Sequence, residues 1–374
     1  MSARYLNHLL TVVIFIGIIY TPLITAIITT DLEQSDVEQR VLTKRPHWKR
    51  RIDLNSYCRD FDKYYADHFG FREKLVYWHN YAKYWLGDSA VKSVIIGKKR
   101  WLFYASTTDG DPIGDYRGLT TLNPDKLAAI TKLLEAKSEL LKKMGIAYIF
   151  VIAPNKETIY GEFLPNYLTK ISKVTIYDQL IEHVNKNKVT LIDLRPILLK
   201  NKPNHQLYYQ SDTHWNYFGA NIAQYEIAKV IADKFPGKIM PQLAEQFSVG
   251  PMVGDLAKML GLKTIFPETI HFLQLTDCFG NIPQQQDDGH KNPSTCHKSN
   301  LKVLFFGDSF GKGILPYFLK YFEQVNYVGI RPQFADINKY IESTKPDLII
   351  EERAERYLQY LSPTDEAILP STSE

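Results

Sequence analysis

The chain has 374 residues, of which 45% are hydrophobic and 23% are charged. This ordinary globular composition excludes a disordered or collagen-like chain, and the length fits one large domain with an appendage, or two domains. The 45 basic and 41 acidic residues are scattered along the chain and give a net charge of only +4. The charge therefore indicates no nucleic-acid partner.

The first 30 residues predict a membrane-spanning helix. Leu9 to Thr30 carry no charge, and as a helix they would reach about 33 Å, enough to cross a hydrocarbon core of roughly 30 Å. Arg4 precedes the segment and acidic residues follow it, so the positive-inside rule exports everything after Thr30. A cleaved signal peptide is the alternative interpretation. Either one puts the body of the protein outside the cytoplasm.

The three cysteines suit an oxidising compartment. Cys278 and Cys296 bracket a polar loop, and a disulfide between them is one interpretation, with two unpaired thiols as the other. Cys58 is left over and is expected to be buried. No Cys-x-x-Cys pair occurs, and His297 beside Cys296 is not a metal-site spacing. Neither a metal nor a cofactor is expected.

After the anchor at 1–30 we expect a juxtamembrane linker and helical region at 31–90, and then the main domain at 91–374 with an insertion at 236–300. A helix with Asn123 as its cap should follow a short strand at Trp101–Tyr104. Near-continuous apolar runs beyond it are typical of strands buried on both faces of a parallel sheet. Those runs are Ala147–Pro154, Val189–Leu194, Leu301–Ser309, Val325–Ile330 and Asp347–Glu352.

Helical patterns alternate with these strands, which predicts a three-layer α/β fold. The expected helices are Thr175–Asn187, Tyr217–Phe235, Gly313–Gln324 and Asp336–Ser343.

The segment Phe305–Gly311 (FFGDSFG) brings a serine to the carboxyl end of a predicted strand and the start of a predicted helix. Open α/β sheets bind ligands at that edge, and free N–H groups at a helix start can stabilise an oxyanion. Ser309 is therefore a candidate nucleophile. The alternative is that Ser309 merely caps the helix.

A second candidate segment is Ser211–Ala220 (SDTHWNYFGA). The Asp212 carboxylate could hold the ring of His214, which could then take a proton from a serine hydroxyl, while Trp215 limits water access. The alternatives are a solvated turn whose aspartate caps the next helix, or a metal site that would need further ligands.

The order of these residues excludes one hydrolase class. Gly307-x-Ser309-x-Gly311 matches the nucleophile elbow of the α/β-hydrolases, in which the histidine follows the serine. The last histidine of this chain is His297, so the base must lie upstream, and His214, with an aspartate two residues before it, is the candidate.

Several motifs follow one another in a fixed order along the chain. They are DHFGFR at Asp67–Arg72, GKKRWLFY at Gly97–Tyr104, APNKETIYGEFLP at Ala153–Pro165, DTHWNYFGA at Asp212–Ala220, GDSF at Gly307–Phe310 and PDLIIEERAERYL at Pro346–Leu358. In these motifs the chain resembles the SGNH-hydrolase-like polysaccharide O-acetyltransferases of bacteria, the family of the alginate acetylation proteins AlgJ and AlgX. The resemblance implies a circularly permuted SGNH fold in which Ser309, His214 and Asp212 form a catalytic triad.

One departure concerns the oxyanion hole. Ordinary SGNH enzymes have an asparagine after the last strand, where this chain has Glu351, Glu352 and Arg353. The Ser309 backbone N–H is the expected first donor, while Glu352 with Arg356 could form a buried ion pair. Lys156 and Tyr160 could line the cleft, or Lys156 could belong to a structural turn with Asn155. The candidates for oxyanion or substrate contact are Gly307, Arg331, Arg353, Arg356 and Tyr357.

The resemblance implies acetyl transfer to hydroxyls of an exported or cell-surface polysaccharide through an acetyl-serine. It further implies a membrane-bound acyltransferase partner that supplies acetyl groups, and a single-pass inner-membrane protein with its catalytic domain in the periplasm. Two alternatives remain open. One is an SGNH-type esterase or deacetylase, and the other is a catalytically silent accessory protein of a polysaccharide export complex.

Overall fold

The computed structural model describes residues 3–29, 31–38, 40–48, 53–273, 299–322, 324–329 and 337–361. The chain divides into two compact units. Unit 1 comprises Met1–Val94 with Asp255–Phe266, and unit 2 comprises Ile95–Gly254 with Pro267–Glu374. The domain boundaries expected from the sequence remain a prediction.

Unit 1 begins with α1 (Ala3–Ile28), whose stretch Leu6–Ala26 has a mean hydropathy of 2.3 and none of its residues buried. In length and composition it is the one helix among the described residues that could cross a membrane. The same properties fit an uncleaved anchor and a signal sequence. The remaining elements of unit 1 are β1 (Gln34–Ser35), β2 (Arg40–Val41), α2 (Leu54–Asp67), α3 (Arg72–Trp85), α10 (Asp255–Met259) and the 3-10 helix η3 (Lys263–Ile265).

Cys58 lies on α2 and is exposed, so the expectation that it is buried was wrong. The reason is the packing of the helix, because no residue of α2 is buried. A small apolar side chain on such a helix has no core to enter.

Unit 2 is built on a five-stranded parallel sheet with the strand order β10-β9-β11-β5-β6. All five strands were expected from the apolar runs, with bounds that differ by a few residues. They are β5 (Ala147–Ala153), β6 (Thr190–Asp193), β9 (Lys302–Phe306), β10 (Gln324–Val328) and β11 (Leu348–Ala354).

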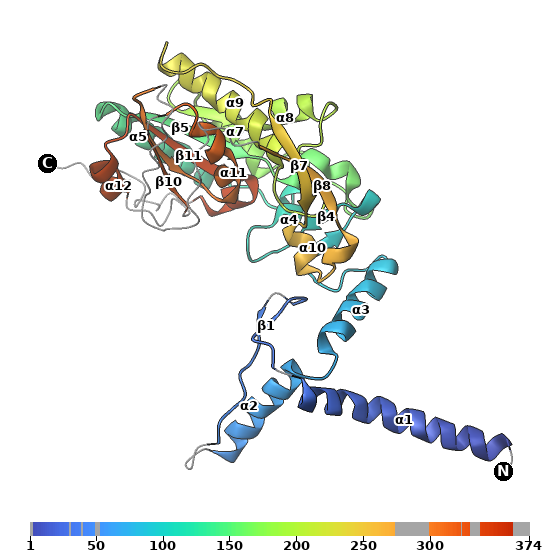
Figure 1. Cartoon of the computed structure of the whole chain (residues 1–374). Coiled ribbons are helices and arrows are strands. Elements are labelled where there is room, and N and C mark those ends of the chain that lie inside the picture. Colours follow the sequence, from blue (N-terminus) through green and yellow to red (C-terminus); the bar gives the residue numbers. More distant parts are fainter. Residues whose placement is uncertain are drawn as a thin grey trace. The chain divides into compact units, whose positions relative to one another are not determined.

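Alternate side chains of each central strand enter two separate cores, which explains the continuous apolar runs. Ile149, Val151 and Ala153 of β5 face a core shared with α8, α9 and α11. Tyr148, Phe150 and Ile152 face a second core shared with α5, α7 and α12. Helices therefore cover both faces of the sheet in three layers (Figure 1). They are α5 (Pro124–Lys143), α7 (Ile176–His183), α8 (Arg195–Asn201), α9 (Tyr217–Lys234), α11 (Ser309–Phe318) and α12 (Ile337–Thr344).

The predicted helices are all present. Asn123 caps α5 as expected, because its side chain accepts the Lys126 N–H at 2.8 Å. The largest difference is α11, which begins at Ser309 rather than at Gly313.

The region expected as an insertion contributes a β-hairpin to unit 2. Strands β7 (Phe247–Met252) and β8 (Glu268–Leu273) pair antiparallel. Phe247 and His271 of this hairpin pack on Phe218 at the start of α9. The remaining elements are β3 (Val94–Ile96), β4 (Leu102–Tyr104), α4 (Pro112–Arg117), α6 (Lys156–Tyr160) and the 3-10 helices η1 (Lys98–Arg100), η2 (Gly161–Phe163) and η5 (Glu355–Tyr360).

A buried ion pair joins α5 to the central strand β11. The Nζ atom of Lys137 lies 2.6 Å from Oε2 of Glu351, and both side chains are 1% exposed. Burial opposes ionisation of Glu351, but the charges of Lys137 and Arg353 outweigh it and lower the pKa of the carboxyl to about 2.

A second buried carboxyl group has its pKa shifted in the opposite direction, upward. Asp115 of α4 is 7% exposed, and its pKa is raised to about 8 by burial and by the nearby carboxylates of Glu355, Asp111 and Glu157. Burial likewise raises the pKa of Glu355 to about 7. Glu355 accepts the Asn155 N–H at 2.8 Å, which places these acids where β5 and β11 end.

We expect Lys137→Met to lower the free energy of unfolding by about 3 kcal/mol or more, because it leaves the buried Glu351 carboxylate with one cation fewer. Chemical denaturation of the purified variant measures this loss. Lys143→Met, which breaks an exposed pair with Glu139, is the matched control and should cost less than about 1 kcal/mol. Equal losses in the two variants would contradict the assignment.

The raised pKa of Asp115 predicts a pH dependence of stability. The folded state keeps a proton that the unfolded chain releases above its ordinary pKa of 3.8. The contribution of Asp115 to the free energy of unfolding is therefore fully present below pH 3.8 and is lost as the pH rises through about 8. Asp115→Asn should flatten the decline by up to about 1.4 kcal/mol per pH unit. Denaturation of both proteins at several pH values between 5 and 9 measures the two slopes, and identical slopes would refute the prediction.

Candidate active site

Ser309 stands at the junction of β9 and α11, as its exposed first helical residue. The helix cap is Asp308, whose Oδ1 atom accepts the Phe310 N–H at 2.8 Å. Its Oδ2 atom accepts the Ala354 N–H at 2.9 Å and so ties the junction to the end of β11. Since Asp308 performs the capping, the interpretation of Ser309 as the cap does not hold.

The glycines around Ser309 make room for a buried carboxyl group. Oε2 of Glu352 accepts the backbone N–H of Asp308 at 3.1 Å and that of Gly311 at 2.9 Å. A Cβ atom would come within 3.0 Å of this oxygen at Gly307 and within 2.7 Å at Gly311. Glu352 thus contacts the backbone of the junction, and the ion pair with Arg356 considered from the sequence is not seen among the described residues.

Burial raises the pKa of Glu352 well above its ordinary range, and the neighbouring Asp308 carboxylate raises it further. Both effects favour the neutral acid, whose oxygen can still accept the two N–H groups. No negative charge is then forced on the start of α11.

Asp212 and His214 lie at the tip of a hairpin-like loop. An antiparallel bridge pairs Tyr208 with Trp215, and inside it the Tyr209 N–H donates to the His214 carbonyl at 3.2 Å. We call residues 209–214 the Asp-His loop. The helix that follows, α9, is capped by Asn216, whose Oδ1 atom accepts the N–H groups of Phe218 and Gly219. Asp212 is therefore not the cap considered from the sequence.

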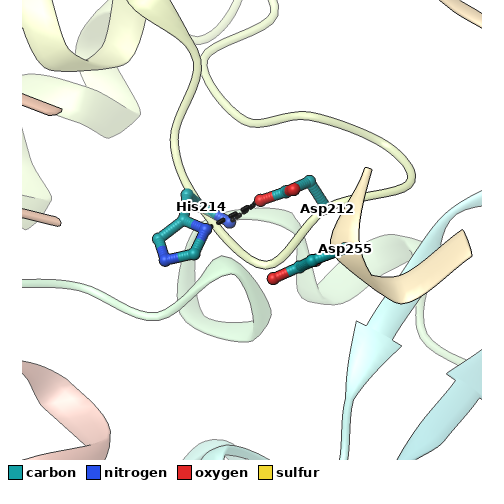
Figure 2. A group of neighbouring side chains, drawn as sticks. All are labelled: Asp212, His214 and Asp255. Atoms are coloured by element: carbon teal, nitrogen blue, oxygen red, sulfur yellow. Dashed lines mark hydrogen bonds and ion pairs between the residues drawn. The ribbon is translucent and has the colours of Figure 1, made fainter. Parts of the chain in front are cut away.

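The Asp212 carboxylate holds both the backbone and the ring of His214. Its Oδ1 atom accepts the His214 N–H at 3.0 Å and lies 2.8 Å from ring Nδ1 (Figure 2). A carboxylate only accepts hydrogen bonds, so Nδ1 carries the proton and Nε2 is left as an acceptor. On that side Nε2 lies 2.7 Å from Oγ of Ser309. The three side chains form a continuous line in which a hydroxyl can be activated by an oriented imidazole.

Packing of two helices explains how residues 95 positions apart meet. The Asp-His loop leads into α9, Ser309 begins α11, and the two helices pack against each other. Trp215 and Phe310 make an edge-on contact at 5.0 Å, and the His214 ring lies 5.1 Å from that of Phe310. Trp215 is 3% exposed, so it is part of the packing beside Phe310.

Three other predicted site residues have structural partners. Arg353 is 3% exposed and donates to Glu351 at 3.0 Å. The guanidinium carbon of Arg356 lies 5.5 Å from the centre of the Phe310 ring and 4.9 Å from that of Tyr357. The Tyr357 hydroxyl donates to Asp109 at 3.1 Å. Arg356 and Tyr357 are thus within reach of the site, whereas Arg353 is committed to the core.

Gly307 lies directly after β9, and its N–H donates to the Val328 carbonyl at 3.2 Å. The Ser309 N–H has no acceptor within the described part of the chain, which leaves it available at the start of α11. Arg331, Cys278 and Cys296 lie outside the described residues.

Two charged side chains contact the Asp-His loop. The sequence suggested that Lys156 could line the cleft or belong to a turn, and it gave no role to Glu268. Lys156 is 1% exposed and so does not line an open cleft, and its Nζ atom lies 2.6 Å from the Asp212 carbonyl oxygen. Glu268 accepts the Gln210 N–H at 2.8 Å. No local pattern indicates these contacts, because each residue acts on backbone more than fifty positions away.

The site supplies Asp212 and His214 as potential metal ligands. Among the described residues of unit 2, no third histidine, cysteine or acid gathers with them around a common point. The described part of unit 2 by itself therefore does not form the three-ligand arrangement of a catalytic metal site.

Much of this chain is similar in sequence to two bacterial proteins. It is 24% identical over 291 residues to the probable alginate O-acetylase AlgJ of Pseudomonas syringae pv. tomato, covering 71% of this chain and 69% of that protein. It is 29% identical to the protein of the same name from Pseudomonas fluorescens, covering 49% of this chain and 45% of that one.

The solved structure of Bacillus cereus PatB1 with a sulfonyl adduct shares the fold. It has a TM-score of 0.52 at 15% identity, over 71% of this chain and 97% of that one. The family model described as SGNH hydrolase-like domain, acetyltransferase AlgX, matches residues 94–328, more than half of the chain. The chain therefore belongs to the family of AlgX-type SGNH hydrolase-like acetyltransferase domains.

Proposed function

We propose that this protein is an O-acetyltransferase that moves acetyl groups onto hydroxyls of an exported polysaccharide through an acetyl-enzyme on Ser309. The observation that carries the proposal is the line from Ser309 Oγ to His214 Nε2, at 2.7 Å, and from His214 Nδ1 to Asp212 Oδ1, at 2.8 Å. Membership of the acetyltransferase family supports the reaction class. The names of the relatives make alginate the first acceptor to test.

In the first half-reaction, His214 Nε2 takes the proton of the Ser309 hydroxyl as Oγ attacks the acetyl carbon of the donor. The oxyanion that forms is stabilised by the Ser309 N–H at the start of α11. The neutral form of Glu352 helps, since a buried carboxylate at that place would repel the oxyanion. The imidazolium then protonates the leaving group, and acetyl-Ser309 remains.

In the second half-reaction, His214 takes a proton from the acceptor hydroxyl, which attacks the acetyl carbon. The second tetrahedral intermediate collapses, Oγ regains its proton from His214, and an acetylated sugar is released. Water can replace the sugar in this step. A carbohydrate esterase is therefore the alternative, and an exposed Ser309 is compatible with it.

The setting proposed for this reaction is the periplasm, with α1 as a single-pass inner-membrane anchor. The apolar stretch Leu6–Ala26 and the charges around it support this orientation. A compartment without an obvious acetyl-CoA supply needs a membrane-bound acyltransferase that passes acetyl groups across. The proposed domains are the anchor at 1–30, a connecting region at 31–90 and the catalytic domain at 91–374 with its insertion at 236–300.

We expect Ser309→Ala to abolish acetylation of the cell-surface polymer, because it removes the hydroxyl that is hydrogen-bonded to His214 Nε2. The acetyl content of the polymer in cells that carry the variant measures this. Ser106→Ala, at a serine hydrogen-bonded to Thr108, is the control and should keep wild-type acetylation. Unchanged acetylation in Ser309→Ala cells, together with loss of polymer export on complete deletion, would favour the accessory-protein alternative.

Full-length protein in detergent, given a chromogenic acetyl ester with alginate oligosaccharides, should produce acetylated sugar. Without the sugar, the rate should drop to slow hydrolysis, because the acceptor's attack on acetyl-Ser309 is then left to water. Mass spectrometry of the oligosaccharide and release of the chromophore measure the two outcomes. Release of acetate at the same rate in both conditions, with no acetylated sugar, would identify an esterase.

A further inference from the structure

The Asp-His loop is held on one side by a buried lysine. Lys156 is the first residue of α6, which follows the end of β5, and its side chain is fully enclosed. Its Nζ atom donates to the carbonyl oxygens of Tyr209 and Gln210 at 3.3 Å each, and to that of Asp212 at 2.6 Å.

Aromatic rings complete the surroundings of this ammonium group. Nζ lies 5.7 Å from the centre of the Trp101 ring and 5.2 Å from that of Phe103. The three donors of an ammonium thus match three carbonyl oxygens, while aromatic faces provide further stabilisation of its charge. A neutral side chain of the same length would leave three carbonyl groups without this donor.

A carboxylate holds the same loop by its N–H groups. One oxygen of Glu268, at the start of β8, accepts the Gln210 N–H at 2.8 Å. The other accepts both the N–H and the hydroxyl of Ser211. Lys156 therefore binds the acceptors of the loop and Glu268 binds its donors, from two elements that are distant in sequence.

We propose that Lys156 and Glu268 are positioning residues, which clamp the Asp-His loop from both sides and so keep Asp212 and His214 aligned with Ser309. This inference rests on the proposed acetyl-transfer function. Neither residue touches the reacting atoms. Both act through the backbone next to Asp212, whose Oδ1 atom fixes the His214 ring. A displacement of about 1 Å at this ring is enough to cost about 100-fold in rate.

The test compares Lys156→Met and Glu268→Gln with the wild-type, full-length protein in detergent, using the chromogenic acetyl ester. We expect each variant to lower kcat/KM by about 10- to 100-fold, mainly through kcat. We expect the double variant to lose less than the product of the two, because both changes release the same loop. The low-field proton resonance of the His214 Nδ1–H reports the alignment directly and should shift or vanish in each variant.

Two controls separate the clamp from general destabilisation. Lys137→Met removes an equally buried lysine of unit 2 that does not contact the Asp-His loop, so it should lower the melting temperature but keep kcat/KM and the resonance. Thr269→Ser, on the exposed side of β8 next to Glu268, should change neither. If Lys156→Met does not fold, Glu268→Gln, whose side chain is only partly buried, decides the question alone.

The clamp is overturned if every one of the two variants that folds keeps the wild-type kcat/KM or the wild-type His214 resonance. It is also overturned if Lys137→Met lowers kcat/KM equally. That result leaves the proposed function intact as long as Ser309→Ala still abolishes acetylation. Failure of the proposed function looks different, because acetylation would then survive Ser309→Ala itself.

Discussion

The hydrogen bond between His214 Nε2 and Ser309 Oγ is the contact on which the chemistry of this protein depends. It exists because two helices that start at the two functional segments, α9 and α11, pack side by side on one face of the sheet. Small residues allow the approach. A Cβ atom on Gly313 of α11 would lie 2.9 Å from the Trp215 indole nitrogen, directly beyond His214.

The sheet fixes the other half of this geometry. Ser309 follows β9, and the neighbouring strand β11 ends in Glu352 and Ala354, which bind the junction through a side chain and a backbone N–H. Because parallel strands end at one edge, groups from β9 and β11 converge there without any local sequence relationship. The junction of β9 and α11 is thus held by hydrogen bonds that would be lost if either strand shifted in register.

In the core of unit 2, the groups around each buried glutamate set the direction of its pKa shift. Lys137 and Arg353 surround Glu351 and lower the pKa of its carboxyl group, so Glu351 is ionised. Glu352 is next in the chain but lies on the opposite face, where burial and the Asp308 carboxylate raise its pKa. Strand alternation sends the two side chains to different layers, so the pKa values of these adjacent glutamates shift in opposite directions. One of them ties α5 to the sheet, and the other supports the start of α11 with little negative charge.

Much of the site was readable in the sequence because its signals are local. The buried strands are continuous apolar runs, Asn123 with Pro124 marks a helix start, and Asp-x-His and Gly-Asp-Ser are short motifs with a fixed order. Local signals were less reliable for capping, since Asp308 and Asn216 perform the roles that Ser309 and Asp212 could equally have had. Cys58 was misjudged because side-chain type alone does not say whether a helix has a core to face.

The sequence by itself determined the α/β class, the identities of the strands and the candidate residues Ser309, His214 and Asp212, because strand burial and short motifs are properties of neighbouring residues. Only the tertiary structure decided that these three side chains form one hydrogen-bonded line, that Glu352 supports a backbone turn rather than Arg356, and that Lys156 and Glu268 bind the Asp-His loop. Apart from the Asp212–His214 contact, these contacts join positions 41 to 95 residues apart, and their distances are set by helix packing and strand register, which no local pattern encodes.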